Sequence, residues 1–268
     1  MSTSHSGTHH ISLFVPELLS GIQLLKDLPK SDVPKLPALQ LLLTRASKSK
    51  QGFSDFYQGV TNLTGIHSQQ HELPLAAITV AVDKKLNRET NSDYFIFAEP
   101  VVMKADRDTV VLLESLKPTL SENSLTLDDS KKLISEINQH FNDEPWQLNI
   151  TNQGDWYLIL NSNTAIQTTN IAAVLYNNAQ AHLPKGDDAR YWRKIINEIE
   201  MLLFSSSVNE TRVKENKPAV ISLWLWGGGV IPETENLNSS FELWSGDDNS
   251  FLKSLALFLS YQYNSLNS

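Results

Sequence analysis

The sequence predicts an α/β (mixed α+β) protein in which a mixed sheet is flanked by helices, and three observations favour this class. Runs rich in β-branched and aromatic residues occur as two pairs, at 94–103 with 109–114 and at 146–151 with 155–160. A helical pattern at 127–141 separates the two pairs. The order strand, strand, helix, strand, strand therefore predicts a β-hairpin–helix–β-hairpin unit in the middle of the chain.

The N-terminal third contains shorter elements. Residues 10–15 (HISLFV) have strand composition, and apolar residues between 18 and 57 recur at helical spacing in pieces that prolines interrupt. Pro74 then opens an apolar helix at 75–82. We expect a single domain over 1–268, with a looser N-terminal helical lobe at 1–85.

Turn signals and an apolar stripe support the central unit. The polar stretch 104–108 (KADRD) separates the first two strands, and the turn 152–154 (NQG) separates the last two. The intervening helix places its apolar residues on one face, namely Leu133, Ile134, Ile137 and Phe141. Asp128 and Asp129 lie in its first turn, where the helix dipole favours negative charge.

The C-terminal part begins with the most regular helical pattern, at 187–204, and a short polar helix follows it before Pro218. The apolar run 220–226 predicts a fully buried strand. Three consecutive glycines, Gly227–Gly229, follow this strand and predict a loop. A strand at 241–244 and an amphipathic helix at 250–261 complete the chain.

Composition excludes several function classes. The 268 residues include no cysteine, which removes disulfides, thiolate metal sites and cysteine nucleophiles and fits a reducing compartment. Lys and Arg number 22 against 30 Asp and Glu, a net charge of −8 that repels nucleic acid and anionic lipid. The basic stretch 45–50 (RASKSK) resembles a solvated loop. We therefore expect a cytoplasmic protein with no nucleic-acid or membrane partner.

Common catalytic and cofactor motifs are missing from the sequence. It has no phosphate-binding loop of the Gly-Lys-Ser/Thr type, no GxGxxG, no GxSxG and no HExxH. His67 and His71 have the spacing of a helical metal pair, but without an evident third ligand we interpret them as loop residues. The sequence thus predicts no catalytic residue, no cofactor and no metal site.

The three glycines carry the most specific signal for a ligand. Glycine at three successive positions after a buried strand indicates that something approaches the backbone closely. Exposed N–H groups there could bind a phosphate or carboxylate, with Arg212 and Arg193 as the nearest cations. Alternatively, another segment of the chain packs against the glycines. Residue type alone leaves both interpretations open.

Two acidic residues form a second candidate. Asp106 and Asp108 flank Arg107 and could hold a divalent cation through their oxygens. Aspartate also supports tight turns through its own backbone hydrogen bonds, and that interpretation is favoured.

A family resemblance rests on several segments from Tyr94 onward. The pattern Val208-Asn209-x-x-Arg212, then Ser222 to Gly229 (SLWLWGGG) with Pro232, resembles the RpfE-type regulatory proteins of proteobacteria. Shorter matches occur at 98–100 (AEP), 105–108 (ADRD), 156–158 (WYL), 192–193 (WR) and 197–198 (NE). The candidate ligand-binding residues are then Gly227, Gly228, Gly229, Arg212, Arg193, Asn209, Asp106 and Asp108.

The same SLWLWGGG stretch also resembles archaeal-type, cofactor-independent phosphoglycerate mutases of the alkaline-phosphatase superfamily. That resemblance implies a metal-bound nucleophile near an N-terminal Asp-Gly and further ligands after the glycines. The sequence shows neither. We therefore expect a non-catalytic regulatory protein that binds a small phosphorylated metabolite or a protein partner. The alternative is a divalent-metal-dependent mutase or phosphotransfer enzyme using Asp106 and Asp108, and a third interpretation is a structural subunit anchored through Trp224, Trp226 and Trp244.

Overall fold

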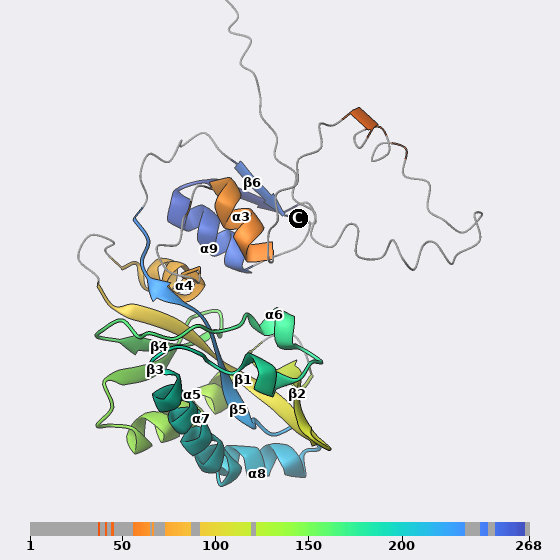
Figure 1. Ribbon diagram of the computed structural model, residues 1–268, viewed down its shortest axis with the longest axis vertical. Helices are drawn as coiled ribbons and strands as arrows, with labels where there is room; N and C mark the ends of the chain where they lie inside the picture. Colours follow the sequence, from red (N-terminus) through yellow and green to blue (C-terminus); the bar gives the residue numbers. More distant parts are fainter. Residues whose placement is uncertain are drawn as a thin grey trace, which may run out of the picture. The chain divides into compact units, whose positions relative to one another are not determined.

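A computed structural model describes residues 37, 41, 44–45, 56–64, 66, 73–86, 92–118, 122–233, 242–245 and 250–265. The chain divides into two compact units, Met1–Ile66 and His67–Ser268. The first contains helix α3 (Phe56–Thr64). The expected strand at 10–15, the basic residues 46–50 and both His67 and His71 lie outside the described residues. The features below belong to the second unit (Figure 1).

Five antiparallel strands form the main sheet, with β1 in its centre. They are β1 (Tyr94–Asp106), β2 (Thr109–Ser115), β3 (Trp146–Ile150), β4 (Trp156–Leu160) and β5 (Ser222–Val230). β5 pairs with β1 from Tyr94 to Val101. On the other edge of β1, β4 pairs with Tyr94–Phe97 and β2 with Val101–Asp106, and β3 follows β4. Three strands therefore share β1 as a neighbour.

The expected hairpin–helix–hairpin unit and the mixed α/β class are confirmed. Helix α5 (Leu127–His140) lies between the hairpins β1–β2 and β3–β4. The N-cap Thr126 accepts a hydrogen bond from the Asp129 backbone N–H, which satisfies one of the free donors at the helix start. The main sheet is antiparallel throughout, and parallel pairing occurs in a separate two-stranded sheet.

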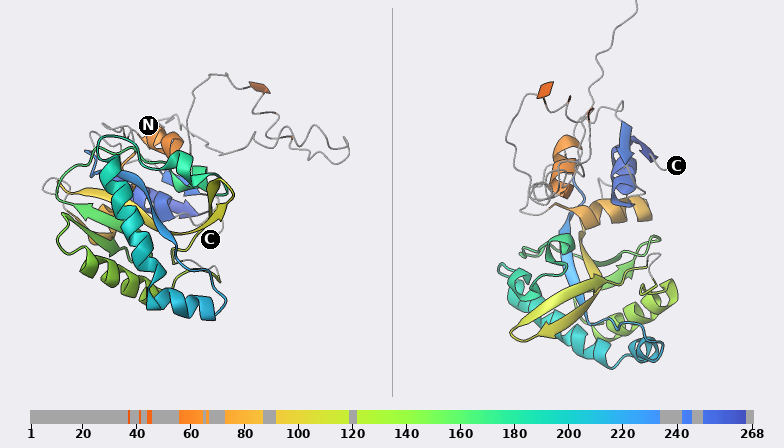
Figure 2. Two further views of the ribbon diagram at one scale, coloured as in Figure 1. Left: turned by 60° about the horizontal axis from the view of Figure 1, so that its bottom comes forward. Right: turned by 90° about the vertical axis from the view of Figure 1, so that its right-hand side faces the viewer.

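Alternation along the strands gives the sheet two apolar faces. One face packs against α5 and α7 (Ala189–Phe204), as Figures 1 and 2 show. Its residues include Ile96 and Ala98 of β1 together with Leu158, Leu223 and Leu225, and they join the helix residues Leu133, Ile137, Trp192, Ile195 and Ile199 in one core. Helix α8 (Ser207–Lys214) follows α7.

The opposite face carries aromatic side chains. Phe97 packs against Trp226 with ring centroids 5.0 Å apart, and Phe95 lies 6.2 Å from Tyr157. Helix α4 (Leu75–Lys84) packs on β1 and β5 here, and α9 (Ser250–Leu259) packs on α4. Helix α4 falls within the lobe expected at 1–85, but it belongs to the second unit, and its buried residues pack with β1, β5 and α9.

Several short elements were not expected from the sequence. They are the helices α6 (Ile171–Val174) and η1 (Ala179–His182), and the strand β7 (Gln262–Ser265), which pairs in parallel with β6 (Glu242–Ser245). Helix α9 connects β6 to β7. The helix expected at 250–261 ends two residues earlier, at Leu259, because β7 begins at Gln262. No helix among the described residues combines the length and the hydropathy needed to cross a membrane.

Two asparagine side chains act as substitutes for peptide groups. Asn138 of α5 donates to the Leu148 carbonyl at 2.8 Å and accepts from the Leu148 N–H at 2.9 Å, on the outer edge of β3. Buried Asn209 of α8 does the same to Val220, with both distances 2.8 Å, and also donates to the Leu203 carbonyl. These amides satisfy backbone groups that would otherwise lack partners.

We expect Asn209→Ala to lower the free energy of unfolding by about 3 kcal/mol, because it leaves buried backbone groups of Leu203 and Val220 without partners. Urea unfolding followed by circular dichroism measures the change. Asn142→Ala, at an exposed position after α5, is the matched control and should change stability by less than about 0.5 kcal/mol. Equal effects of the two substitutions would contradict this role of Asn209.

Candidate functional site

The three glycines do not form a loop, and this sequence-based expectation was wrong. Gly227, Gly228 and Gly229 belong to β5 and are buried. The ladder between β5 and β1 has an irregularity at this point, and Gly227 adopts φ +66°, as glycine commonly does at a bulge. The segment is therefore paired with β1 over most of its length instead of projecting as an open anion-binding loop.

Close neighbours explain why glycine occupies these positions. A Cβ on Gly228 would clash with the Tyr94 ring, and one on Gly229 would lie 2.5 Å from the Pro74 Cβ. At Gly227 it would lie 3.2 Å from the Leu75 Cβ and 3.3 Å from the Phe97 ring. The start of α4 can approach β5 because side chains are absent here. This is the packing interpretation of the two that the sequence left open.

The candidate cations are engaged with backbone carbonyls. Arg212 is buried, and its guanidinium donates to the carbonyls of Pro218 at 2.8 Å, Asn123 at 2.5 Å and Ser124 at 3.4 Å. Burial lowers the pKa of this guanidinium. Arg193 donates through Nε and Nη2 to the Pro184 carbonyl, at 3.0 and 2.7 Å. Both arginines hold loop backbones in place.

The acidic candidates lie at an exposed turn. Asp106 and Asp108 flank Arg107, which has φ +44°, at the tip of the β1–β2 hairpin. The Thr109 hydroxyl donates to the Asp106 carbonyl at 3.1 Å, a hydrogen bond within the turn. Among the described residues, no group of three or more His, Cys, Asp or Glu side chains is arranged to hold a metal ion.

Two hollows on the described surface lie along α5. One is lined by Lys131, Ile134, Ser135, Asn138, Gln139, Leu148, Asn149 and Ile150. The other is lined by Glu136, Gln139, His140, Leu202, Ser205, Ser206 and Ser207. Neither includes any of the eight candidate ligand-binding residues. The structure thus distributes those candidates among separate packing contacts.

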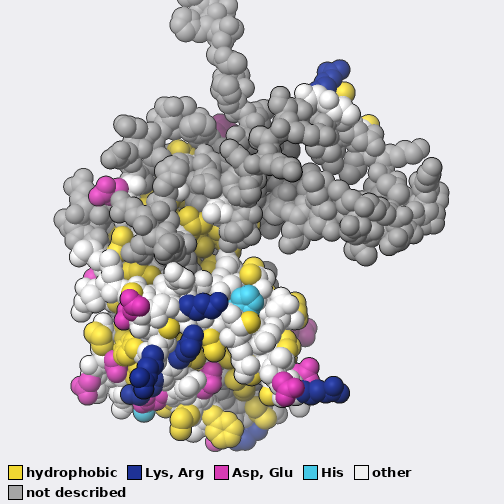
Figure 3. Space-filling model, viewed as in Figure 1, with side chains coloured by type: hydrophobic (Ala, Val, Ile, Leu, Met, Phe, Trp, Pro, Cys, Tyr) yellow, Lys and Arg dark blue, Asp and Glu magenta, His cyan; other side chains and the backbone are white. Residues whose placement is uncertain are grey.

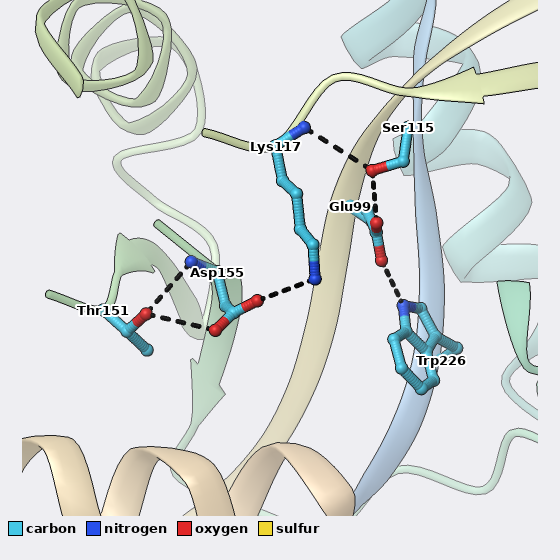
Figure 4. A network of polar contacts seen from close by, with 6 residues as sticks. All are labelled: Glu99, Ser115, Lys117, Thr151, Asp155 and Trp226. Atoms are coloured by element: carbon cyan, nitrogen blue, oxygen red, sulfur yellow. Dashed lines mark hydrogen bonds and ion pairs between the residues drawn. The ribbon is translucent and has the colours of Figure 1, made fainter. Parts of the chain in front are cut away.

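Sequence reasoning missed a buried polar network on the aromatic face of the sheet (Figure 4). Its centre is Glu99 of β1, which is only 7% exposed to solvent. The Trp226 indole donates to one carboxylate oxygen at 2.9 Å, and the Ser115 hydroxyl donates to the other. The Lys117 backbone N–H in turn donates to the Ser115 oxygen at 3.5 Å. The network therefore connects β1, β2 and β5.

An ion pair lies beside this centre. The Lys117 ammonium is 3.2 Å from the Asp155 carboxylate, which also contacts the Thr151 hydroxyl (Figure 4). Thr151 and Asp155 lie at the turn between β3 and β4. Within this turn the Asn152 backbone N–H donates to the Asp83 carboxylate of α4 at 2.9 Å. Burial and the nearby Asp83 carboxylate raise the pKa of Tyr157 to about 12, so this phenol stays neutral at physiological pH.

The charges and donors of the network limit what it can bind. Both Glu99 oxygens already have donors, so the carboxylate is engaged within the protein. Carboxylates outnumber the nearby cations. The three carboxylates are Glu99, Asp155 and Asp83, and the two cations are Lys117 and Lys84. An additional anion would meet net negative charge here. A signal was present in the sequence, since Glu99 is the single acidic residue within the apolar run 94–103.

Comparisons with known proteins give local and partial similarity. No family model matches the chain. A probable 2,3-bisphosphoglycerate-independent phosphoglycerate mutase of Geobacter sulfurreducens is 32% identical over 62 residues, which is 23% of this chain and 16% of that protein. The matched stretch thus spans about one sixth of the mutase's length.

Two solved structures resemble the chain at 13% sequence identity. A cofactor-independent phosphoglycerate mutase from Thermoplasma acidophilum aligns with a TM-score of 0.42, covering 75% of this chain and 55% of that one. The PH0037 protein from Pyrococcus horikoshii aligns with a TM-score of 0.40, covering 71% and 42%.

The Glu99–Trp226 pair can be tested by a double-mutant cycle. We expect Glu99→Leu to cost about 2 kcal/mol of unfolding free energy, because the buried Trp226 indole loses its acceptor. Trp226→Phe alone should also destabilise, since it removes a donor from a buried carboxylate. The double variant should lose less than the sum of the two, by about 1 kcal/mol or more, as urea unfolding will measure. Strict additivity would contradict a direct coupling.

Proposed function

We propose that this chain is a non-catalytic regulatory protein of the RpfE type, built on part of a phosphoglycerate-mutase-like scaffold, and that it acts by binding a protein partner. The observation that carries this proposal is that the residues bearing the resemblance are already hydrogen-bonded or closely packed within the protein. Arg212, Asn209 and the three glycines all make contacts within the protein. The residues that bear the resemblance thereby have a structural explanation that requires no substrate.

The electrostatics favour a protein over a phosphorylated metabolite as the ligand. A phosphate site is built from cations and free N–H donors that point at the ligand. Here the glycine segment lies in a strand ladder, and the charged groups near it are three carboxylates, Glu99, Asp155 and Asp83, and two lysines, Lys117 and Lys84. A phosphorylated metabolite would gain few donors and would meet like charge.

Phosphoglycerate mutase activity is the second candidate, and the 62-residue similarity to the Geobacter protein favours it. In that case Asp106 and Asp108 would hold a divalent ion and Arg193 or Arg212 would contact the phosphate. Phosphoryl transfer depends on cations positioned around the transferring group. Because both arginines donate to backbone carbonyls, each would have to break those hydrogen bonds to take this role.

An activity assay with the full chain distinguishes the two candidates. We expect no conversion of 3-phosphoglycerate to 2-phosphoglycerate with manganese, magnesium or zinc. We also expect no rise in melting temperature with either phosphoglycerate, 2,3-bisphosphoglycerate or inorganic phosphate. A ligand at one hundred times its dissociation constant would stabilise the fold by about 2.7 kcal/mol, which a thermal melt detects readily.

Manganese-dependent turnover that is lost in Asp106→Ala and retained in Asp143→Ala would overturn the proposal and support the mutase. Asp143 is a matched control because its side chain is also exposed, in the turn after α5. A selective rise in melting temperature without turnover would instead replace the protein partner by a metabolite.

A further inference from the structure

The outer side of α7 carries charged and apolar residues in a definite order. We call this surface the α7 ridge and define it by Arg190, Arg193, Lys194, Asn197, Glu200, Met201 and Phe204. At 3.6 residues per turn, these seven lie within an arc of about 120° centred on Asn197. Six of them are exposed and Glu200 is half-buried. The ridge is cationic in the first half of the helix and apolar at its end.

The apolar end of the ridge is unusually accessible. Met201 is 75% exposed and Phe204 is 91% exposed, one helical turn apart. Large apolar side chains that gather on a surface indicate an interface more often than single ones do. Figure 3 shows Lys and Arg side chains gathered near the start of α7 and hydrophobic side chains near its end, on the same face of the molecule.

The order of residues is complementary to itself. When two copies of α7 lie antiparallel with a two-fold axis beside Asn197, Arg190 of one copy faces Phe204 of the other. Lys194 of one copy faces Glu200 of the other, and Arg193, whose guanidinium donates to the Pro184 carbonyl of its own chain, faces Met201. A cation over an aromatic ring and a cation beside a carboxylate are both attractive. Two-fold symmetry produces each contact twice.

Charge distinguishes this arrangement from the alternatives. Two copies in parallel would place the three cations of one ridge against those of the other. The antiparallel arrangement places Glu200, Met201 and Phe204 opposite the cations.

We propose that the α7 ridge binds a second copy of this chain, forming an antiparallel two-fold dimer centred on Asn197. The inference is independent of the proposed function. A helix of 16 residues is about 24 Å long, and a single pair of such helices makes a small interface. The dimer should therefore dissociate in the micromolar range.

Disulfide trapping tests the predicted symmetry directly, because the chain contains no cysteine. Packed helices bring residues beside a two-fold axis within the Cα separation that a disulfide needs, about 4.4–6.8 Å. The Asn197→Cys variant should form a covalent dimer under mild oxidation. Asp106→Cys, equally exposed at the hairpin tip, is the control. Dimer formation from Asn197→Cys that is no faster than from Asp106→Cys would overturn the proposal.

Sedimentation velocity over a concentration series measures the association itself. Glu200→Lys should raise the dissociation constant about tenfold, because it places a cation opposite Lys194. Adding Lys194→Glu to this variant should recover most of the loss, and Phe204→Asp should abolish the dimer. These side chains lie outside the core, so circular dichroism and the melting temperature should stay near those of the unmodified chain. A protein that stays monomeric at 200 micromolar contradicts the proposal, because this concentration is roughly ten or more times the expected dissociation constant. A dimer that is insensitive to Phe204→Asp contradicts it as well.

Discussion

The structure depends on one strand that is buried on both faces. From Tyr94 to Val101 every residue of β1 is buried, because α5 and α7 cover one face and α4 covers the other. Antiparallel sheets commonly leave one face to solvent, and a strand covered on both sides must be apolar almost throughout. The neighbouring strand β5 meets the same demand, and its glycines let α4 approach it closely.

Burial of this extent makes each polar group within it costly, and the polar residues are arranged accordingly. Glu99 interrupts the apolar strand and receives donors from Ser115 and Trp226, two residues on different strands. Asn209 and Arg212 each satisfy several backbone groups at the junction of α8 with the following loop. Buried polar groups are retained where their partners are complete. Asn209 and Arg212 therefore have a structural role in this fold.

The sequence was sufficient for most elements with a strong local pattern and insufficient where distant contacts decide. The central hairpins and α7 were predicted because alternation and helical spacing are local properties. The strand β7 (QYNS) lacks alternation, and its pairing with β6 comes from across α9. Glycine type indicated a close approach at 227–229, but only the fold identifies Tyr94, Pro74 and Leu75 as the neighbours. The network around Glu99 joins residues 127 positions apart, a separation no local pattern encodes.

The two sides of α7 are constrained by different physical demands. Its inner side, with Trp192, Ile195 and Ile199, is determined by packing against the sheet, and changes there cost core stability. Apart from Arg193, whose guanidinium donates to the Pro184 carbonyl, its outer side contributes little to that core, so the fold itself leaves most of the order of charges and apolar groups free. On that side the sequence places cations, an amide and then the exposed Met201 and Phe204 in line. Because of this separation, substitutions on the outer side of α7 are expected to leave the fold intact.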